Sequence, residues 1–215
     1  MEYVIYSKST PKSKLNAHNI SISKECKIGN NVKIYSGCRL CGKCIVEDNV
    51  TLWHNSFLDS ATVGEGTEIK SSYVENSIIG KKCTVGPFAH IRDNSSVGDE
   101  CRLGNFIEIK NSIMGKKSKM AHLAYMGDAI VGENCNIGCG VVFCNYNGKI
   151  KQKCILGNNV FVGSNANLIA PVTIEDNTYI AGGSTINQDI KKGEFAIARA
   201  RQTNKTNFKN PYLDR

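Results

Sequence analysis

An apolar residue returns at every sixth position, with occasional five-residue steps, along most of this chain. Helices repeat at 3.6 residues and strands at two, so a period of six is neither element alone and indicates a repeat architecture. The phased residues are Ile22, Ile28, Ile34, Leu40, Val46, Leu52, Leu58, Val63, Ile69, Val74, Ile79, Val85, Ile91, Val97, Leu103, Ile109, Met114, Met120, Met126, Val131, Ile137, Phe143, Leu156, Val162, Leu168, Ile174, Ile180 and Ile186.

Each six-residue unit predicts one short strand and one corner. Glycine often follows the phased residue, as in Ile28-Gly29 and Val162-Gly163, and we expect it there because the corner needs backbone conformations that other residues resist. Three units, about eighteen residues, close a triangular coil, and stacked coils pair every strand with those above and below. Burying one such side chain contributes about 1.5–3 kcal/mol, so a stack can offset its ordering entropy. The prediction is an all-β protein, a parallel β-helix.

Seven of the ten cysteines stand two residues before a phased position and therefore share its inward face. Although Cys38-x2-Cys41-x2-Cys44 has the spacing of a metal site, this inward phase favours small buried fillers. Ten mainly internal thiols without a secretory signal favour a reducing compartment, and we expect a cytoplasmic protein. The seven are Cys26, Cys38, Cys44, Cys83, Cys101, Cys135 and Cys154.

Composition restricts the partners. With 41% hydrophobic residues and no long apolar run, the chain is expected to be soluble, without a membrane partner. Its net charge of +8 is spread over scattered Lys and Arg, and aromatic residues make up only 7%. This pattern argues against nucleic acid and suits a phosphorylated small molecule.

Breaks in the repeat divide the chain. Residues 1–19 form a polar lead-in, 20–188 the β-helix domain and 189–215 a C-terminal arm. The repeat also breaks between Phe143 and Leu156, so this segment must leave the coil as a protruding loop. Loops on rigid scaffolds often carry function.

A series of uncommon motifs occupies the second half of the chain: GPFAHIR, GNFIEIK, SKMAHLAYMGDA, NIGCG, CNYNG, FVGSNANLIAPV and IARARQ. In these motifs, from about Ile79 to Pro211, the chain resembles the C-terminal acetyltransferase domain of the bacterial bifunctional N-acetylglucosamine-1-phosphate uridylyltransferase/glucosamine-1-phosphate N-acetyltransferase. That domain belongs to the hexapeptide-repeat acyltransferase superfamily. The resemblance implies a left-handed β-helix, a homotrimer with sites between subunits, and transfer of acetyl from acetyl-CoA to the amine of glucosamine 1-phosphate.

His122 matches the general base of this family. An amine attacks a thioester only as the free base, and an unperturbed imidazole, which titrates near pH ~6.5, can accept its proton at neutral pH. The phase of His122 points it away from the apolar column, and stacking places Cys139 one coil above it. The resemblance implies that the Cys139 N–H steadies the oxyanion. It further implies that Glu108 orients the base, although an ordinary surface glutamate is an equal alternative.

The resemblance also implies binding residues for both substrates. Ser164 and Gly182 stand one coil apart in a single column, and their family counterparts line the acetyl-CoA site. The acetyl-CoA residues would be Cys139, Asn145, Tyr146, Ser164, Gly182 and Arg199, with Asn145 and Ser164 next to the reacting groups. The residues for the amino sugar phosphate would be Arg92, Lys110, Tyr125, Asn136 and Lys151, of which the basic ones suit a phosphate.

Alternatives remain. His90 stands where the family often has arginine, so another amino sugar, such as galactosamine 1-phosphate, is a rival substrate. A further alternative is that the chain is a catalytically silent β-helix that serves as an assembly protein. A zinc carbonic anhydrase would need a third histidine beside His54 and His90, but Ser95 occupies that position, so no metal is expected. The residues of this chain do not include a counterpart of the family's uridylyltransferase half, and we therefore expect neither uridylyl transfer nor a magnesium requirement.

Overall fold

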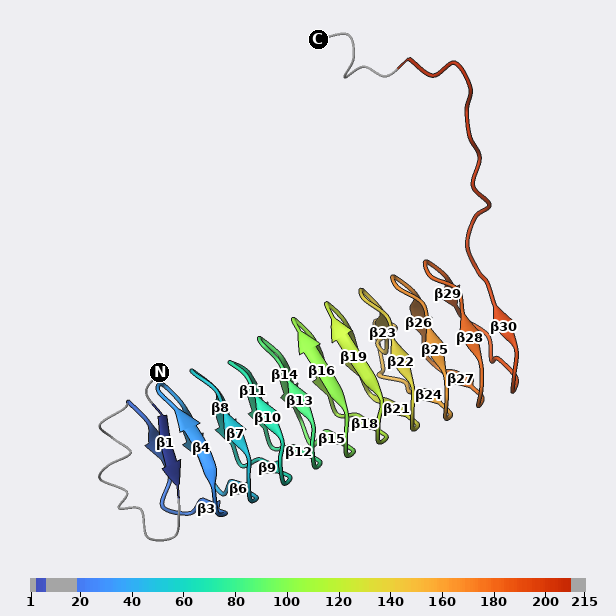
Figure 1. The fold of residues 1–215 in the computed structure, drawn as a ribbon. Helices are drawn as coiled ribbons and strands as arrows, with labels where there is room; N and C mark the ends of the chain where they lie inside the picture. The colour runs from blue at the N-terminus through green and yellow to red at the C-terminus, as the bar shows by residue number, and fades with distance from the viewer. Residues whose placement is uncertain (1–2, 7–18, 210–215) are drawn as a thin grey trace.

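A computed structural model describes residues 3–6 and 19–209. Within these residues the chain contains strands and no helix, and it winds into a stack of coils with three long sheets along its sides (Figure 1). Apart from the first strand, every strand pairs in parallel with the strand one coil away. The predicted all-β parallel β-helix is confirmed.

The three sheets, named here A, B and C, follow one another around each coil. Sheet A consists of β1 (Tyr3–Tyr6), β4 (Val32–Tyr35), β7 (Thr51–Leu52), β10 (Glu68–Ile69), β13 (Thr84–Val85), β16 (Arg102–Asn105), β19 (Lys119–His122), β22 (Asn136–Ile137), β25 (Phe161–Val162), β28 (Tyr179–Ile180) and β30 (Phe195–Ala196). Sheet B consists of β2 (Ser21–Ile22), β5 (Arg39–Cys41), β8 (Phe57–Asp59), β11 (Tyr73–Glu75), β14 (His90–Arg92), β17 (Glu108–Lys110), β20 (Tyr125–Gly127), β23 (Val142–Cys144), β26 (Asn167–Ile169) and β29 (Thr185–Ile186). Sheet C consists of β3 (Lys27–Ile28), β6 (Ile45–Val46), β9 (Thr62–Val63), β12 (Ile78–Ile79), β15 (Ser96–Val97), β18 (Ile113–Met114), β21 (Ala129–Val131), β24 (Cys154–Leu156) and β27 (Val172–Ile174).

The phased apolar residues form the core. From Ile34 to Ile186 every one of them is buried, and Ile22 and Ile28 in the first coil are partly buried. Because each pairs with its counterpart one coil away, as Met120 does with Ile137, the core is a continuous column along the stack. No helix in the described part of the chain has the length and apolar character needed to cross a bilayer.

The second inward position holds small residues. Six of the seven cysteines predicted there are buried, and Cys26 is partly buried. Burial raises the pKa of the Cys38 thiol to about 11. Serine shares this position: the Ser118 hydroxyl donates to the Gly132 carbonyl at 2.8 Å. Small side chains are required here because the core column already fills the interior.

The recurring glycine has a different cause from the one expected. Of the glycines that follow a phased residue, only Gly86 has a left-handed backbone conformation. The left-handed corner usually falls two residues later, on residues such as Asn31 and Asn134. A Cβ on Gly163 would instead meet the Gly182 nitrogen of the next coil at 2.3 Å. The glycines are thus needed because successive coils approach closely at this point.

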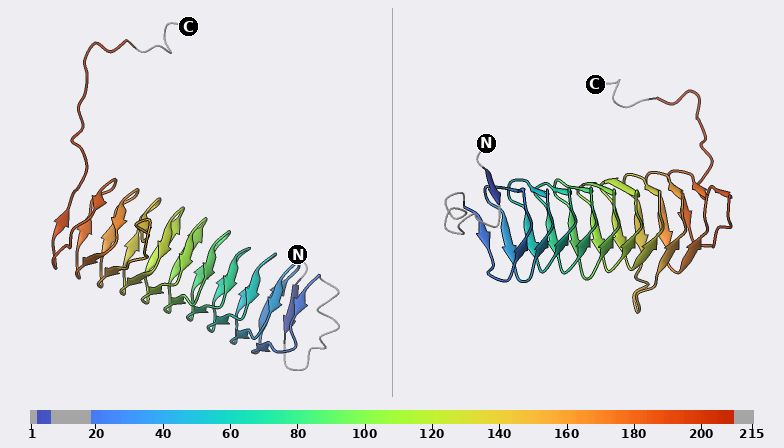
Figure 2. Two further views of the ribbon diagram at one scale, coloured as in Figure 1. Left: turned by 180° about the vertical axis from the view of Figure 1, so that it is seen from behind. Right: turned by 60° about the horizontal axis from the view of Figure 1, so that its bottom comes forward.

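Both ends of the stack depart from the expected boundaries. Within the lead-in, β1 pairs with β4 in antiparallel fashion and covers the edge of sheet A. At the other end, strand pairing continues past residue 188, because β30 pairs with β28. Ala198 is still hydrogen-bonded to Thr185 in the last coil. Residues 199–209 then leave the stack as an arm, and a loop formed after β23 protrudes from the side of the stack (Figure 2). An antiparallel bridge between Tyr146 and Lys151 closes this loop.

Candidate active site

Neighbouring strands of sheet B gather most of the residues expected to bind the sugar phosphate. Register pairs Arg92 on β14 with Lys110 on β17, and Glu108 on β17 with Tyr125 on β20. The loop after β23 adds further residues from the next coil. These residues are named here the sheet-B cluster: Arg92, Glu108, Lys110, Tyr125, Asp128, Asn145 and Lys151.

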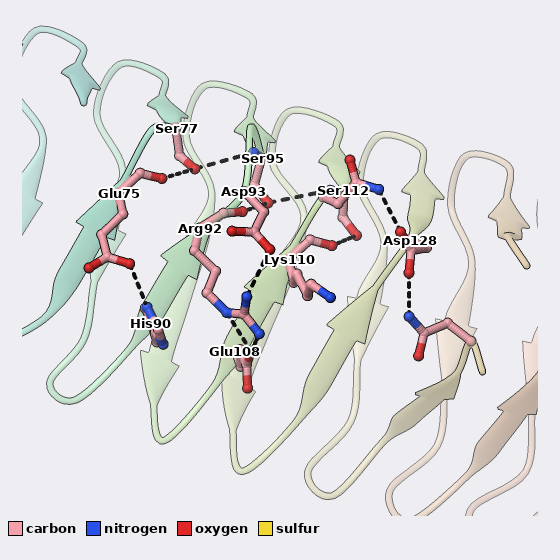
Figure 3. Close-up of polar contacts among 12 residues, drawn as sticks. Glu75, Ser77, His90, Arg92, Asp93, Ser95, Glu108, Lys110, Ser112 and Asp128 are labelled. Carbon is pink, nitrogen blue, oxygen red and sulfur yellow. Dashed lines mark hydrogen bonds and ion pairs between the residues drawn. The ribbon is translucent and has the colours of Figure 1, made fainter. Parts of the chain in front are cut away.

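Arg92 is held by carboxylates on two sides (Figure 3). Its Nε donates to Glu108 Oε1 at 2.9 Å, and its Nη2 lies 2.8 Å from the same oxygen. Its Nη1 donates to Asp93 Oδ2 at 2.8 Å. Glu108 therefore orients the Arg92 guanidinium within this chain. The side chain that contacts His122 is Asn105 instead.

Two lysines converge beside Arg92. The Lys151 side chain lowers the pKa of Lys110, with some desolvation and the charge of Arg92 adding to the effect. Contact with Lys110 and the charge of Asp128 raise the pKa of Lys151. Arg92, Lys110 and Lys151 can each contribute positive charge to a dianionic ligand. The carboxylates of Glu108, Asp93 and Asp128 offset part of that charge.

Asp128 ties the protruding loop to the coil. Its Oδ2 accepts a short hydrogen bond from Asn145 Nδ2, and its Oδ1 accepts one from Asn111 Nδ2 at 2.5 Å. Burial opposes its ionisation, but these bonds and the charges of Lys151 and Lys110 outweigh it and lower the pKa of Asp128. Asn145, only 7% exposed, is thereby fixed beside Tyr125.

His122 lies at the corner where sheet A turns into sheet B. It ends β19, its side chain is exposed, and its Nδ1 lies 3.1 Å from Asn105 Oδ1 on β16. Met120 pairs with Ile137, which puts Cys139 one coil above His122. The Gly140 N–H donates to the His122 carbonyl at 3.4 Å. We call the corner positions Asn105, His122, Cys139, Ser164 and Gly182 the corner column.

The corner column continues toward the C-terminal end of the stack. The Ser164 carbonyl accepts a hydrogen bond from the Gly183 N–H at 2.8 Å, so Gly182 lies against Ser164 in the next coil. Arg199 turns back from the arm, and its Nη1 donates to the Gly182 carbonyl at 2.9 Å. The column is open to a ligand, since Ser164 and Arg199 are exposed.

Asn136 lies on a different sheet from the residues expected to bind the sugar with it, whereas Tyr146 lies beside Asn145 and Lys151. Asn136 projects from sheet A, where it pairs with Lys119 and Phe161, whereas Arg92 and Tyr125 belong to sheet B. Tyr146, bridged to Lys151 at the base of the protruding loop, is 60% exposed, and its hydroxyl donates to the Gly148 carbonyl.

Sequence reasoning missed Asn105 and Asp128. Asn105 is one coil before His122 and lies within the GNFIEIK motif, so column spacing could have found it. Asp128 lies within the SKMAHLAYMGDA motif, one coil after Asn111 and one coil before Asn145, so the same column spacing could have found it.

The residues of the carbonic anhydrase alternative are separated. His54 Nδ1 lies 3.0 Å from Ser36 Oγ, and His90 Nε2 lies 3.2 Å from Glu75 Oε2. Across residues 3–6 and 19–209, no three His, Cys, Asp or Glu side chains are arranged to hold a metal ion.

Two protein families match the chain. The family described as "GMPPB C-terminal domain" matches residues 11–100 and 74–145, which overlap and together span more than half of the chain. The family described as "Bacterial transferase hexapeptide (six repeats)" matches residues 153–188.

Curated relatives are similar over most of the chain. "Bifunctional protein GlmU" of Clostridium botulinum (strain 657 / Type Ba4) is 45% identical over 184 residues, which cover 86% of this chain and 40% of the relative. The protein of the same name from Clostridioides difficile (strain 630) is 46% identical over 188 residues, covering 87% and 41%. The chain thus spans about two fifths of the length of these relatives, corresponding to their C-terminal acetyltransferase domain.

Solved structures share the fold. The UDP-N-acetylglucosamine acyltransferase from Campylobacter jejuni superposes with a TM-score of 0.67 at 16% identity, covering 84% of this chain and 70% of that one. The enzyme of the same name from Francisella novicida gives a TM-score of 0.58 at 14% identity, covering 78% and 63%. The fold is the left-handed parallel β-helix of such acyltransferases.

Proposed function

The chain belongs to the hexapeptide-repeat acyltransferase superfamily and matches the C-terminal acetyltransferase domain of GlmU, and from this premise we propose that it is a glucosamine-1-phosphate N-acetyltransferase. Acetyl-CoA is the donor, and the sugar amine is the acceptor. The observation that carries the proposal is an exposed histidine, His122, which belongs to the open corner column and lies at the edge of the sheet that carries Arg92, Lys110 and Tyr125.

His122 acts as the general base. The amine nitrogen attacks the thioester carbonyl, its proton passes to His122, and collapse of the tetrahedral intermediate breaks the C–S bond and releases CoA thiol, with the proton returned to the thiolate. Because Asn105 Oδ1 can only accept, Nδ1 carries the hydrogen and Nε2 keeps the lone pair that takes the proton.

The N–H of Cys139 stabilises the oxyanion. The backbone N–H groups on either side of it are already hydrogen-bonded. The Gly138 N–H donates to the Val162 carbonyl at 2.9 Å, and the Gly140 N–H donates to the His122 carbonyl. A donor aimed at the developing negative charge can be worth about 3 kcal/mol in the transition state. Ser164 would lie near the thioester sulfur, with the rest of CoA running along Gly182 toward Arg199.

The sheet-B cluster binds the sugar phosphate. Arg92 supplies a planar fork, and Lys110 and Lys151 supply mobile charges. Asn145, fixed by Asp128, and Tyr146 would close over the reacting groups.

The site is completed by a second subunit of a homotrimer. A neighbour whose sheet A faces sheet B would bring its Asn136 to the sugar held by Arg92 and Lys110. Mixing a Lys110→Met chain with an Asn136→Ala chain should then create some sites with both wild-type residues, and hence a lower KM for the sugar phosphate than either variant shows alone. A fully active monomer would overturn this arrangement.

The reaction is tested by measuring free CoA thiol with acetyl-CoA and a panel of amino sugar phosphates. We expect release with glucosamine 1-phosphate, loss of release in His122→Ala, and normal release in the control His54→Ala, whose histidine occupies the same corner several coils away. No release with any amino sugar, or an unaffected His122→Ala variant, would refute the proposal.

Galactosamine 1-phosphate is the second candidate in this panel. His90 replaces an arginine common in the family, and it contacts Glu75 and the Tyr73 ring rather than extending freely over sheet B. A higher kcat/KM for galactosamine 1-phosphate than for glucosamine 1-phosphate would favour that substrate.

A further inference from the structure

The side chain in contact with His122 is a neutral amide. Asn105 and His122 are paired residues on β16 and β19, one coil apart, and the Asn105 Oδ1 lies 3.1 Å from His122 Nδ1. The backbones are also joined at this corner, because the Leu123 N–H donates to the Asn105 carbonyl at 3.1 Å. The pair is therefore held by the sheet register rather than by a chance side-chain encounter.

Charged groups are directed elsewhere. Arg102 and Lys119, the charged residues of β16 and β19, are paired at the opposite ends of these strands. On the other side of His122, the corner after β22 contributes Cys139. Of the carboxylates nearest in the sequence, Glu108 is bound to Arg92 through two nitrogen atoms, and Asp128 is bound to Asn111 and Asn145.

We infer that Asn105 is a positioning residue that holds His122 in the Nδ1–H tautomer and aims Nε2 at the substrate amine. This inference rests on the proposed function and assigns the orienting role to Asn105 instead of Glu108. An amide acceptor fixes the ring without adding a negative charge, so it leaves the proton affinity of the imidazole less altered than a carboxylate would.

The tautomer can be measured without catalysis. The chain has only four histidines, so the ¹⁵N shifts of His122 in the full chain, above its titration range, can be assigned by comparison with His122→Gln. We expect Nδ1–H in the wild type and a shift toward Nε2–H in Asn105→Ala. Ser36→Ala, which removes the Ser36 hydroxyl from His54 Nδ1 at the same corner, should alter only the His54 signals.

Kinetics test the positioning role. Asn105→Ala should lower kcat by about tenfold to a hundredfold, part of the 10²–10⁴-fold that a general base contributes, with little change in the KM for the sugar phosphate. Asn105→Asp should restore much of kcat and move the acid limb of kcat/KM upward by about one pH unit, because a carboxylate beside the imidazole favours its charged form. Thermal denaturation should show that both variants are folded.

The tautomer and the kinetics separate a failure of the role of Asn105 from a failure of the proposed function. An Nε2–H tautomer in the wild type, or an unchanged tautomer and unchanged kcat in Asn105→Ala, would overturn the role of Asn105. Absence of CoA release by the wild type would instead overturn the proposed function, and the Nδ1–H signal would then report the hydrogen bond alone.

Discussion

Asp128 and Asn145 come from successive coils and are joined by a short hydrogen bond from the amide Nδ2 to the carboxylate Oδ2. A second bond from Asn111 occupies the other carboxylate oxygen. Asp128 is only 6% exposed, so it fixes the root of the protruding loop from within the coil stack. The loop that carries Asn145 and Lys151 is therefore set by a residue outside the loop.

Replacing Asp128 by Asn should destabilise the protein in a pH-dependent way. The pKa of Asp128 is lowered in the folded state, so its contribution is complete above the unfolded pKa and is lost as pH falls through the folded pKa, below about pH 4. We expect a loss of about 1–3 kcal/mol at neutral pH that shrinks in acid. Thermal unfolding from pH 7 to pH 3 measures this loss of stability. Asp59→Asn is the control, because among the described residues the wild-type Asp59 carboxylate accepts a hydrogen bond only from the adjacent Ser60 hydroxyl. A constant difference across that range would contradict the role assigned to Asp128.

Removing the charge of either Lys110 or Lys151 should weaken sugar phosphate binding. In Lys110→Met and Lys151→Met we expect KM for the sugar phosphate to rise about tenfold or more, while kcat changes less. The lowered pKa of Lys110 further predicts that wild-type KM rises at alkaline pH before an ordinary lysine would titrate. Lys116→Met, which removes a lysine paired with Glu133, should leave KM unchanged. Equal effects in all three variants would indicate a general loss of positive charge.

Glu108→Gln should separate two roles of the carboxylate. Because Glu108 binds Arg92, we expect a changed KM for the sugar phosphate and an unchanged acid limb of the kcat/KM profile. A displaced acid limb with an unaltered KM would show that Glu108 acts on His122.

Two adjacent glycines should respond differently to alanine. A Cβ on Gly163 would lie 2.3 Å from the Gly182 nitrogen, whereas a Cβ on Gly182 would lie 3.1 Å from the Ser164 carbonyl oxygen and needs only a small adjustment. Gly163→Ala should cost about 1–3 kcal/mol by overpacking, and Gly182→Ala much less. Chemical denaturation of both variants makes the comparison, and equal stabilities would refute close coil approach as the reason for glycine.

The hexad pattern was sufficient for the architecture. A residue such as Met120 points inward because its phase allows no other direction, and the cysteine phase proved to be internal for the same reason. Constant coil length also predicts Cys139 over His122 and Gly182 over Ser164, where the structure has them. These relationships are local in a solenoid, since each coil contacts only its neighbours.

Other features depend on side-chain geometry, which the repeat does not encode. The sequence by itself determined the stacked coils, the buried column and the outward face of His122, because periodicity fixes which way each residue points. Only the tertiary structure decided that Glu108 binds Arg92, that Asn105 meets His122, and that Asp128 holds the loop. Sequence spacing places each pair on neighbouring coils, but whether their polar atoms come within hydrogen-bonding distance follows from rotamers and loop closure.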